Sequence, residues 1–212
     1  MKDARVSELD AQHEVESSHD AGVMHPHGFH RLLHPVWFKL VHGSLADVVA
    51  ARDGERVVDV GGGTGALSDR LARPGVEVIC LEPDRASVIE AGRRLIGRSI
   101  SFVEGNAEHL PLRASSLDAA VASVTAHHWV DPSAGFAELA RVLRPGGRLI
   151  LAEFKPGGRW LRRLRRLAGS KHVDALDLEG WSTQLRAAGF ADVTRPSVGP
   201  ASALALFIRA IR

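Results

Sequence analysis

The sequence predicts an α/β fold: a three-layer sandwich in which a mostly parallel, seven-stranded sheet carries helices on both faces and ends in an antiparallel hairpin. From residue 56 onward, short apolar runs alternate with helical segments of about ten or more residues, a pattern typical of parallel strands joined by right-handed crossovers. Only seven residues, 196–202, separate the last two apolar runs. That link is too short for a crossover helix, so these two strands are expected to pair antiparallel.

Each element of this fold has its own segment of the sequence. Apolar residues at helical spacing predict a helix over residues 35–51, with Pro35 near its start and Gly54 beyond its end. The expected strands cover residues 57–60, 76–81, 100–103, 117–124, 148–154, 191–195 and 203–211. Further helices are expected up to about residue 73 after the first strand, and over residues 85–96, 132–143 and 178–188.

The change of pattern near residue 55 indicates the domain organisation. Residues 1–54 contain no strand-like alternation, and we expect them to form an N-terminal helical lid or cap. Residues 55–212 are expected to form the main domain, with a basic cap insertion at residues 155–177.

The composition excludes several classes of protein. Hydrophobic residues make up 45% and charged residues 25% of the 212 residues, which are globular values rather than those of a disordered chain. The single cysteine, Cys80, rules out an internal disulfide and a cysteine-based zinc site. No apolar run approaches the roughly 20 residues that span a bilayer. The first twenty residues hold six acidic and two basic residues without an apolar core, so a cytoplasmic location is expected.

Seven basic residues and no acidic one lie between Lys155 and Lys171. Within this segment Leu161, Leu164 and Leu167 recur every third residue, which predicts an amphipathic basic helix. Three interpretations remain open: the helix binds an anionic acceptor, residues 159–167 rest on an acidic membrane surface, or the helix is a solvated cap. A nucleic-acid partner is not expected, because Trp160 is the only aromatic residue of the segment that could stack on a base.

A glycine-rich turn, Asp59 to Gly65, follows the first expected strand. Ligands of open α/β sheets bind at the carboxyl ends of strands, and glycine lets the backbone approach them closely. The spacing also satisfies the dinucleotide fingerprint, so the turn alone does not separate a nicotinamide enzyme from other adenosine binders. No lysine follows Gly65, which excludes a phosphate P-loop. A carboxylate at Asp59 would oppose a pyrophosphate but suit a cationic ligand.

Two further segments indicate an adenosine ligand. Glu82 ends the second expected strand, where a carboxylate accepts hydrogen bonds from ribose hydroxyls. Asn106 opens the loop after the third strand. A side-chain oxygen there can accept from an adenine amino group while a backbone N–H donates to the ring.

Five motifs in order carry a resemblance to a known family. They are Asp59–Gly65, Leu81–Asp84, Asn106–Leu112, Ser116–Ala120 and Glu138–Gly147. Over residues 57–154 the sequence resembles the class I S-adenosylmethionine-dependent methyltransferases, which have a Rossmann-like fold. It is most similar to the branch that includes the ubiquinone/menaquinone-biosynthesis and other small-molecule methyltransferases.

The resemblance implies a cofactor site for S-adenosylmethionine. The turn would contact the methionine part, the residues after the second strand would hold the ribose, and the following loop would read adenine. In this sequence those positions are Asp59, Gly61, Gly63 and Gly65, then Glu82 and Pro83, then Asn106 and Ala107. The family often has Asp where this chain has Asn106, which keeps an acceptor but loses the charge, so weaker adenine binding is expected.

The implied function is methyl transfer to a small-molecule or lipid-like acceptor by in-line displacement. Two alternatives remain: a methyltransferase-like protein that binds the cofactor without transferring methyl, and a nicotinamide-dependent oxidoreductase. The acceptor atom and the oligomeric state are not encoded in any motif of the sequence.

His127, His128 and Trp129 lie just beyond the fourth expected strand. A histidine suits a general base because its pKa lies near neutrality. We expect the two histidines to be the catalytic candidates, with His128 lining the site, and Trp129 to pack against substrate or cofactor. The alternatives are a histidine bonded to backbone and a tryptophan in the core.

Histidines are also frequent near the N-terminus, and His30 and His34 have the i, i+4 spacing of a metal pair on a helix. Pro26 and Gly28 disrupt regular geometry, and no acidic residue lies between residues 20 and 47, so no metal site is expected. If the segment covers the active site, His27 and His30 would contact the substrate; otherwise they are surface histidines.

Overall fold

The structure is a computed structural model that describes residues 30–155 and 176–212, with side chains described from residue 38 onward. The chain divides into two compact units, residues 1–33 and residues 34–212. Of the first unit only residues 30–33, the start of a helix, are described.

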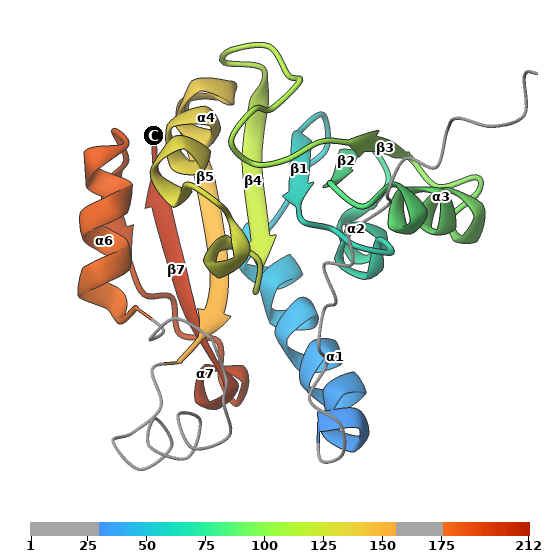
Figure 1. Cartoon of the computed structure of the whole chain (residues 1–212), viewed down its shortest axis with the longest axis horizontal. Helices are drawn as coiled ribbons and strands as arrows, with labels where there is room; N and C mark the ends of the chain where they lie inside the picture. The colour runs from blue at the N-terminus through green and yellow to red at the C-terminus, as the bar shows by residue number, and fades with distance from the viewer. Residues whose placement is uncertain (1–29, 156–175) are drawn as a thin grey trace, which may run out of the picture. The chain divides into compact units, whose positions relative to one another are not determined.

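The described elements follow the expected alternation closely (Figure 1). In chain order they are α1 (His30–Val49), β1 (Arg56–Val60), α2 (Ala66–Leu71), β2 (Glu77–Glu82), α3 (Arg85–Arg94), β3 (Ile100–Glu104), β4 (Leu117–Ser123), the 3₁₀ turn η1 (Ala126–His128), α4 (Pro132–Val142), β5 (Leu143–Phe154), α6 (Leu178–Ala187), β6 (Ala191–Thr194), α7 (Ala201–Leu204) and β7 (Ala205–Ile211).

The seven strands form one sheet in the order β3-β2-β1-β4-β5-β7-β6. The neighbours among β1 to β5 pair in parallel, and β7 pairs antiparallel with both β5 and β6. The predicted fold class, including the antiparallel hairpin, is confirmed. The lateral position of the hairpin is a finding of the structure, because β7 lies between β5 and β6 rather than at the edge.

Two predicted strand boundaries were wrong. The strand expected over 203–211 begins at Ala205, because Ala201–Leu204 form one helical turn, α7, in the link after β6. The strand expected at 148 begins at Leu143. Its first residues form an irregular stretch opposite β4, with a register shift between Leu117 and Ala119 and with Gly146 at φ +79°.

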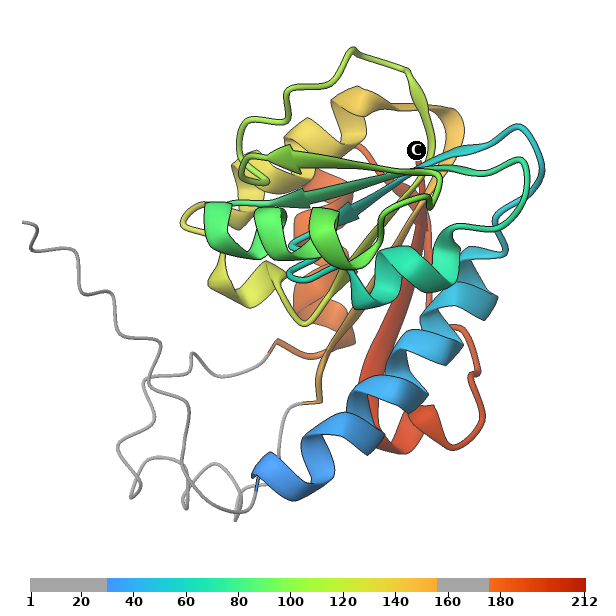
Figure 2. The same cartoon turned by 90° about the vertical axis from the view of Figure 1, so that its right-hand side faces the viewer.

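Helices lie on both faces of the sheet (Figure 2), and one apolar cluster lies between each helical layer and the sheet. Helices α4 and α6 cover one face, where Phe136, Leu139, Trp181 and Leu185 are buried. Helices α1, α2 and α7 cover the other, and their buried side chains include Val41, Leu45, Leu67, Leu71 and Ala201. Alternation along the strands feeds both clusters, as a period of two requires.

Helix α1 packs on the same core as the sheet. It begins at His30, five residues before the predicted start. Val41, Leu45 and Val49 repeat every four residues and are fully buried, so they form one apolar stripe. Residues 34–54 of the expected lid therefore belong to the sheet-containing unit. A lid role for residues 1–54 stays a prediction.

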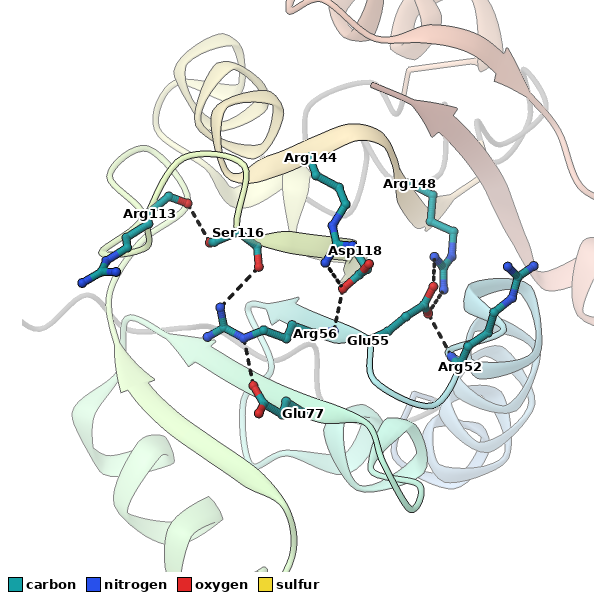
Figure 3. Close-up of polar contacts among 9 residues, drawn as sticks. All are labelled: Arg52, Glu55, Arg56, Glu77, Arg113, Ser116, Asp118, Arg144 and Arg148. Atoms are coloured by element: carbon teal, nitrogen blue, oxygen red, sulfur yellow. Dashed lines mark hydrogen bonds and ion pairs between the residues drawn. The ribbon is translucent and has the colours of Figure 1, made fainter.

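A network of arginines and carboxylates ties together the amino ends of the strands (Figure 3). Asp118 at the start of β4 accepts from the backbone N–H of Arg56 at 2.8 Å and from the guanidinium of Arg144 at 2.7 Å. Arg148 of β5 forms a bidentate pair with Glu55 and donates to the carbonyl of Val49 at the end of α1. This network lies at the amino ends of the strands, whereas the glycine turn lies at the carboxyl end of β1.

Candidate functional site

The glycine turn leaves β1 at its carboxyl end and leads into α2. Gly61, Gly63 and Gly65 have φ values of +72°, +54° and +80°, which L side chains rarely adopt. A Cβ at Gly61 would clash with Oγ1 of Thr125, and one at Gly65 would lie 2.7 Å from Leu95. Close contacts as well as backbone conformation therefore require glycine at these two positions. At Gly61 the absence of a side chain lets the segment after β4 approach the turn.

Gly63 differs because the space beside it is open. Apart from Gly63 itself and its two chain neighbours, no heavy atom of the described residues lies within 4 Å of a Cβ built on Gly63. Its N–H donates to Oε2 of Glu82 at 2.9 Å, and the N–H of Asp84 donates to Oε1 at 3.1 Å. The structure thus brings together two predicted site residues from different strands, with Pro83 beside them. Each carboxylate oxygen of Glu82 keeps a lone pair for a further donor such as a hydroxyl.

Asp59 lies behind the turn rather than in the open space. Its side chain is 1% exposed, and Oδ2 accepts from the hydroxyl of Ser68 in α2 at 2.7 Å. Burial raises the pKa of the Asp59 carboxyl to about 6, against the lowering effect of Ser68, and the nearby Glu82 carboxylate raises it further. Asp59 therefore supports the turn from within the protein, and direct contact with a cofactor stays a prediction.

The predicted adenine loop follows β3 and begins beside Glu82, whose carbonyl accepts from the N–H of Gly105. The side chain of Asn106 is exposed, and its Oδ1 accepts from the N–H of His109 at 3.0 Å. This bond closes a local turn and leaves the oxygen one lone pair. Ala107 is buried in the core, so its backbone is the part that is available for recognition.

Two sets of hydrogen bonds that hold this loop were not predicted from the sequence. One set joins the loop to helix α4, and the other joins it to the residues just before α4. Glu138 and Arg141 pair on α4 and bond the backbone of the loop at Leu110 and Leu112. The Arg141 guanidinium holds the pKa of the Glu138 carboxyl below its ordinary value. Glu108 accepts from backbone N–H groups just before α4. Glu138 and Arg141 fall in a family motif at i, i+3 spacing, which was the available signal.

His127 and His128 form η1 at the carboxyl end of β4, next to the end of β5. Nδ1 of His127 lies 2.7 Å from Oε2 of Glu153, and Oε1 of Glu153 accepts from the N–H of Ala126 at 2.9 Å. His128 is exposed, and the two imidazole centroids are 3.9 Å apart. Sequence reasoning missed Glu153, although a carboxylate inside an apolar strand run was a signal.

Trp129 packs on helix α4. A Cβ at Gly135 would lie 2.5 Å from its ring, and the ring centroids of Trp129 and Phe136 are 5.2 Å apart. This is the core packing that the sequence left open as an alternative. Contact with a substrate stays a prediction.

Three expectations concern residues whose side chains the structure does not describe. They are His27 and His30 as substrate contacts and residues 159–167 as an anionic or membrane-facing surface. Within the described side chains, no three His, Cys, Asp or Glu residues gather closely enough to hold a metal ion. No helix in the described ranges is both long and apolar enough to cross a bilayer.

The carboxyl ends of four neighbouring strands thus carry an open glycine turn, an oriented carboxylate, an exposed amide and a histidine held by a buried acid. Residues 58–151, from β1 to β5, match the family described as a methyltransferase domain. This match, together with the similar proteins described next, supports a class I methyltransferase domain over these residues.

A curated relative of this methyltransferase domain is the demethylmenaquinone methyltransferase of Beutenbergia cavernae. It is 42% identical over 116 residues, which are 55% of this chain and 48% of that protein. The chain thus spans about half the length of the curated relatives it matches.

Solved structures share the fold of the methyltransferase domain. The putative methyltransferase of Haloferax volcanii, solved with the Trm112 methyltransferase activator, has a TM-score of 0.69 and 18% identity over 85% of this chain and 92% of that chain. The [4+2]-cyclase SpnF has a TM-score of 0.62 and 24% identity over 79% of this chain and 80% of that chain. Likeness at these identities shows the fold, and a fold leaves the reaction open.

Proposed function

We propose that this protein transfers a methyl group from S-adenosylmethionine to a small-molecule or lipid-like acceptor. The observation that carries the proposal is the open space at Gly63 beside the oriented Glu82 carboxylate. A nucleoside with free ribose hydroxyls fits an acceptor pair of this kind. The carboxylates of Glu82 and Asp59 at the turn favour a cationic ligand over a pyrophosphate.

The residues present fit the cofactor in three parts. The backbone at Gly61, Gly63 and Gly65 would take the methionine part, Glu82 with Pro83 the ribose, and Asn106 with Ala107 the adenine. When bound, the cofactor supplies an electrophilic methyl group for in-line displacement, so the protein must mainly align the acceptor.

His127 is the better oriented of the two catalytic candidates. The Glu153 carboxylate fixes its ring, while His128 is exposed beside it. In this proposal His127, held by Glu153, or the exposed His128 beside it takes a proton from the acceptor, and His128 and Trp129 line the approach. His27 and His30 would contact the acceptor as part of an N-terminal lid formed by residues 1–54.

Exposed apolar side chains beside this segment support a lipid-like acceptor. Val130 is 97% exposed, two residues after His128, and Phe154 is exposed with its ring centroid 5.5 Å from that of His127. Relatives named demethylmenaquinone methyltransferases support the same class of acceptor. Within the proposal, residues 159–167 hold an anionic part of the acceptor or contact an acidic membrane surface, and the protein works in the cytoplasm without a nucleic-acid partner.

The proposal is tested by calorimetric titration with S-adenosylhomocysteine and, in parallel, with NAD. We expect S-adenosylhomocysteine to bind and NAD not to bind. Binding of NAD alone would replace the proposal with the nicotinamide-dependent oxidoreductase, and binding of neither ligand would contradict it.

A second candidate is a protein that binds the cofactor without transferring methyl. The shared fold of the [4+2]-cyclase favours keeping it, because that neighbour is named for a different reaction. Incubation with cofactor labelled in the methyl group and a panel of quinone-like and other small acceptors separates the two. Labelled product supports the enzyme, and tight binding with no labelled product across the panel supports the second candidate.

A further inference from the structure

We infer that Glu138 and Arg141 of α4 are positioning residues for adenine recognition, acting through the backbone of the loop over residues 106–112. This inference rests on the proposed function, because it deepens the cofactor site named there. The two side chains do not reach the open space at Gly63. They act on the cofactor only by fixing where the loop places the Asn106 oxygen and the Ala107 backbone.

The pair binds the loop through a backbone N–H and through backbone carbonyls. Oε2 of Glu138 accepts from the N–H of Leu110 at 2.8 Å. Arg141 donates through Nη2 to the carbonyl of Leu110 at 3.0 Å and through Nη1 to the carbonyl of Leu112 at 2.9 Å. The two side chains also pair with each other, with N–O distances of 2.6 and 2.7 Å. Charge-assisted bonds of this geometry are the stronger ones.

These bonds hold the far end of the loop, whereas its start is held by the bond from the N–H of Gly105 to the carbonyl of Glu82. The Asn106 oxygen accepts from His109 within the loop itself. Leu110 is buried, so its N–H and carbonyl need partners inside the protein. Glu138 supplies the partner of the N–H, and Arg141 shares the carbonyl with the N–H of Leu112, so the pair helps to fix the far end of the segment that carries the adenine contacts.

A second tie joins the same loop to the acceptor side. Oε1 of Glu108 accepts from the N–H of Val130 at 2.8 Å and from that of Asp131 at 3.3 Å. These residues follow Trp129 directly. The loop is therefore tied to both ends of α4: to Glu138 and Arg141 in its last turns and to the backbone just before its first turn.

The test compares S-adenosylhomocysteine with S-inosylhomocysteine, which has an oxygen in place of the adenine amino group. In the Arg141→Met variant, which keeps an apolar stem but removes every donor, we expect affinity for S-adenosylhomocysteine to fall about tenfold and its preference over S-inosylhomocysteine to shrink about threefold or more. A merely structural role would lower both affinities equally. Glu138→Gln keeps an acceptor for Leu110, so a smaller loss is expected than in Glu138→Ala.

Glu55→Gln is the matched control, since it weakens a bidentate pair with Arg148 at the other edge of the sheet. We expect it to lower thermal stability while the preference between the two ligands stays that of the wild type. Hydrogen exchange at the Leu110 amide gives a second readout and is expected to speed up in Arg141→Met and Glu138→Gln.

Each contrary outcome is distinct. An unchanged preference in folded Arg141→Met, or in Glu138→Gln if the first variant does not fold, overturns the positioning role alone. An equal change of preference in Glu55→Gln also overturns it, because the effect would then be general instability. A wild-type protein that binds neither ligand overturns the proposed function and this inference together.

Discussion

Nδ1 of His127 lies 2.7 Å from a carboxylate oxygen of Glu153, which is 2% exposed within strand β5. An ionised carboxylate only accepts hydrogen bonds, so Nδ1 carries the proton of the neutral ring and Nε2 is the basic nitrogen. The same carboxylate accepts from the N–H of Ala126 and so fixes the backbone of η1 as well. A single acid thus sets both the place of the ring and its tautomer.

Glu153→Gln should reverse that tautomer. The glutamine carbonyl can keep the bond from Ala126, and its amide then donates to Nδ1, which moves the ring proton to Nε2. Nitrogen-15 NMR of the histidine rings measures this directly, with His127→Gln assigning the signal. His128 is the internal control, and its signal is expected to keep its form. A Glu153→Gln protein whose His127 still carries the proton on Nδ1 would contradict the prediction.

Glu82→Ala should weaken binding of S-adenosylhomocysteine more than about tenfold, because two charge-assisted hydrogen bonds to the ribose are lost. Calorimetric titration measures the effect. Glu77→Ala is the matched control, since Glu77 begins the same strand at the opposite edge and pairs with Arg56 on the surface. Equal affinities in the two variants would remove Glu82 from the site.

Asp59→Asn should stabilise the protein at pH 7.5. The Asp59 pKa is raised from 3.8 to about 6 in the folded state, so the folded protein holds this proton more tightly than the unfolded chain, and stability falls as pH rises from about 4 to 6. Asparagine removes that loss and keeps an acceptor for Ser68. We expect a gain of up to about 3 kcal/mol at pH 7.5 that shrinks below about 1 kcal/mol near pH 4, measured by urea unfolding. A destabilised variant at pH 7.5 would contradict this reading of the buried carboxyl.

His42→Leu should stabilise the protein at pH 5. Burial, with Arg70 nearby, lowers the His42 pKa from 6.5 to about 4. The folded state therefore keeps the ring neutral while the unfolded chain takes up a proton, and stability is lost as pH falls from about 6.5 to 4. The variant lacks this loss. We therefore expect the difference in free energy of unfolding between variant and wild type to be about 2 kcal/mol more favourable to the variant at pH 5 than at pH 8.

The buried Asp59 and His42 have opposite pH dependences between about pH 4 and 6. Their effects offset each other in the wild type, so each single variant should show a steeper pH dependence of stability than the parent. Urea unfolding of both variants across this range checks the sign, and parallel curves for all three proteins would contradict it.

The strand directions were predictable because they follow from the length of each connection. The short link before the last strand, expected as seven residues and ten residues long in the structure, predicted the antiparallel direction. A link of that length does not decide the second neighbour of the strand, and β7 lies between β5 and β6. The start of β5 was missed because Arg144 to Gly147 has the composition of a turn, whereas β5 already begins at Leu143, opposite Leu117.

The candidate site was predictable where a residue type is tied to a strand end, as with Gly63 and Glu82. The site was not predictable where contacts depend on the register between strands or on which side of a helix faces the loop. Glu153 reaches His127 because β5 lies beside β4 in one register, with Ala152 opposite Ser123. Glu108 and Glu138 likewise depend on how α4 sits over the loop.

The arginine network at the amino ends of the strands has a practical consequence for protein engineering. Its members, such as Arg148 with Glu55 and Arg144 with Asp118, are separated from Gly63 and Glu82 by the length of the strands. Substitutions that raise thermal stability at the amino ends of the strands leave the residues at the ligand-facing carboxyl ends unchanged. Stability at one end of the strands and ligand contacts at the other can therefore be altered in the laboratory by separate sets of substitutions.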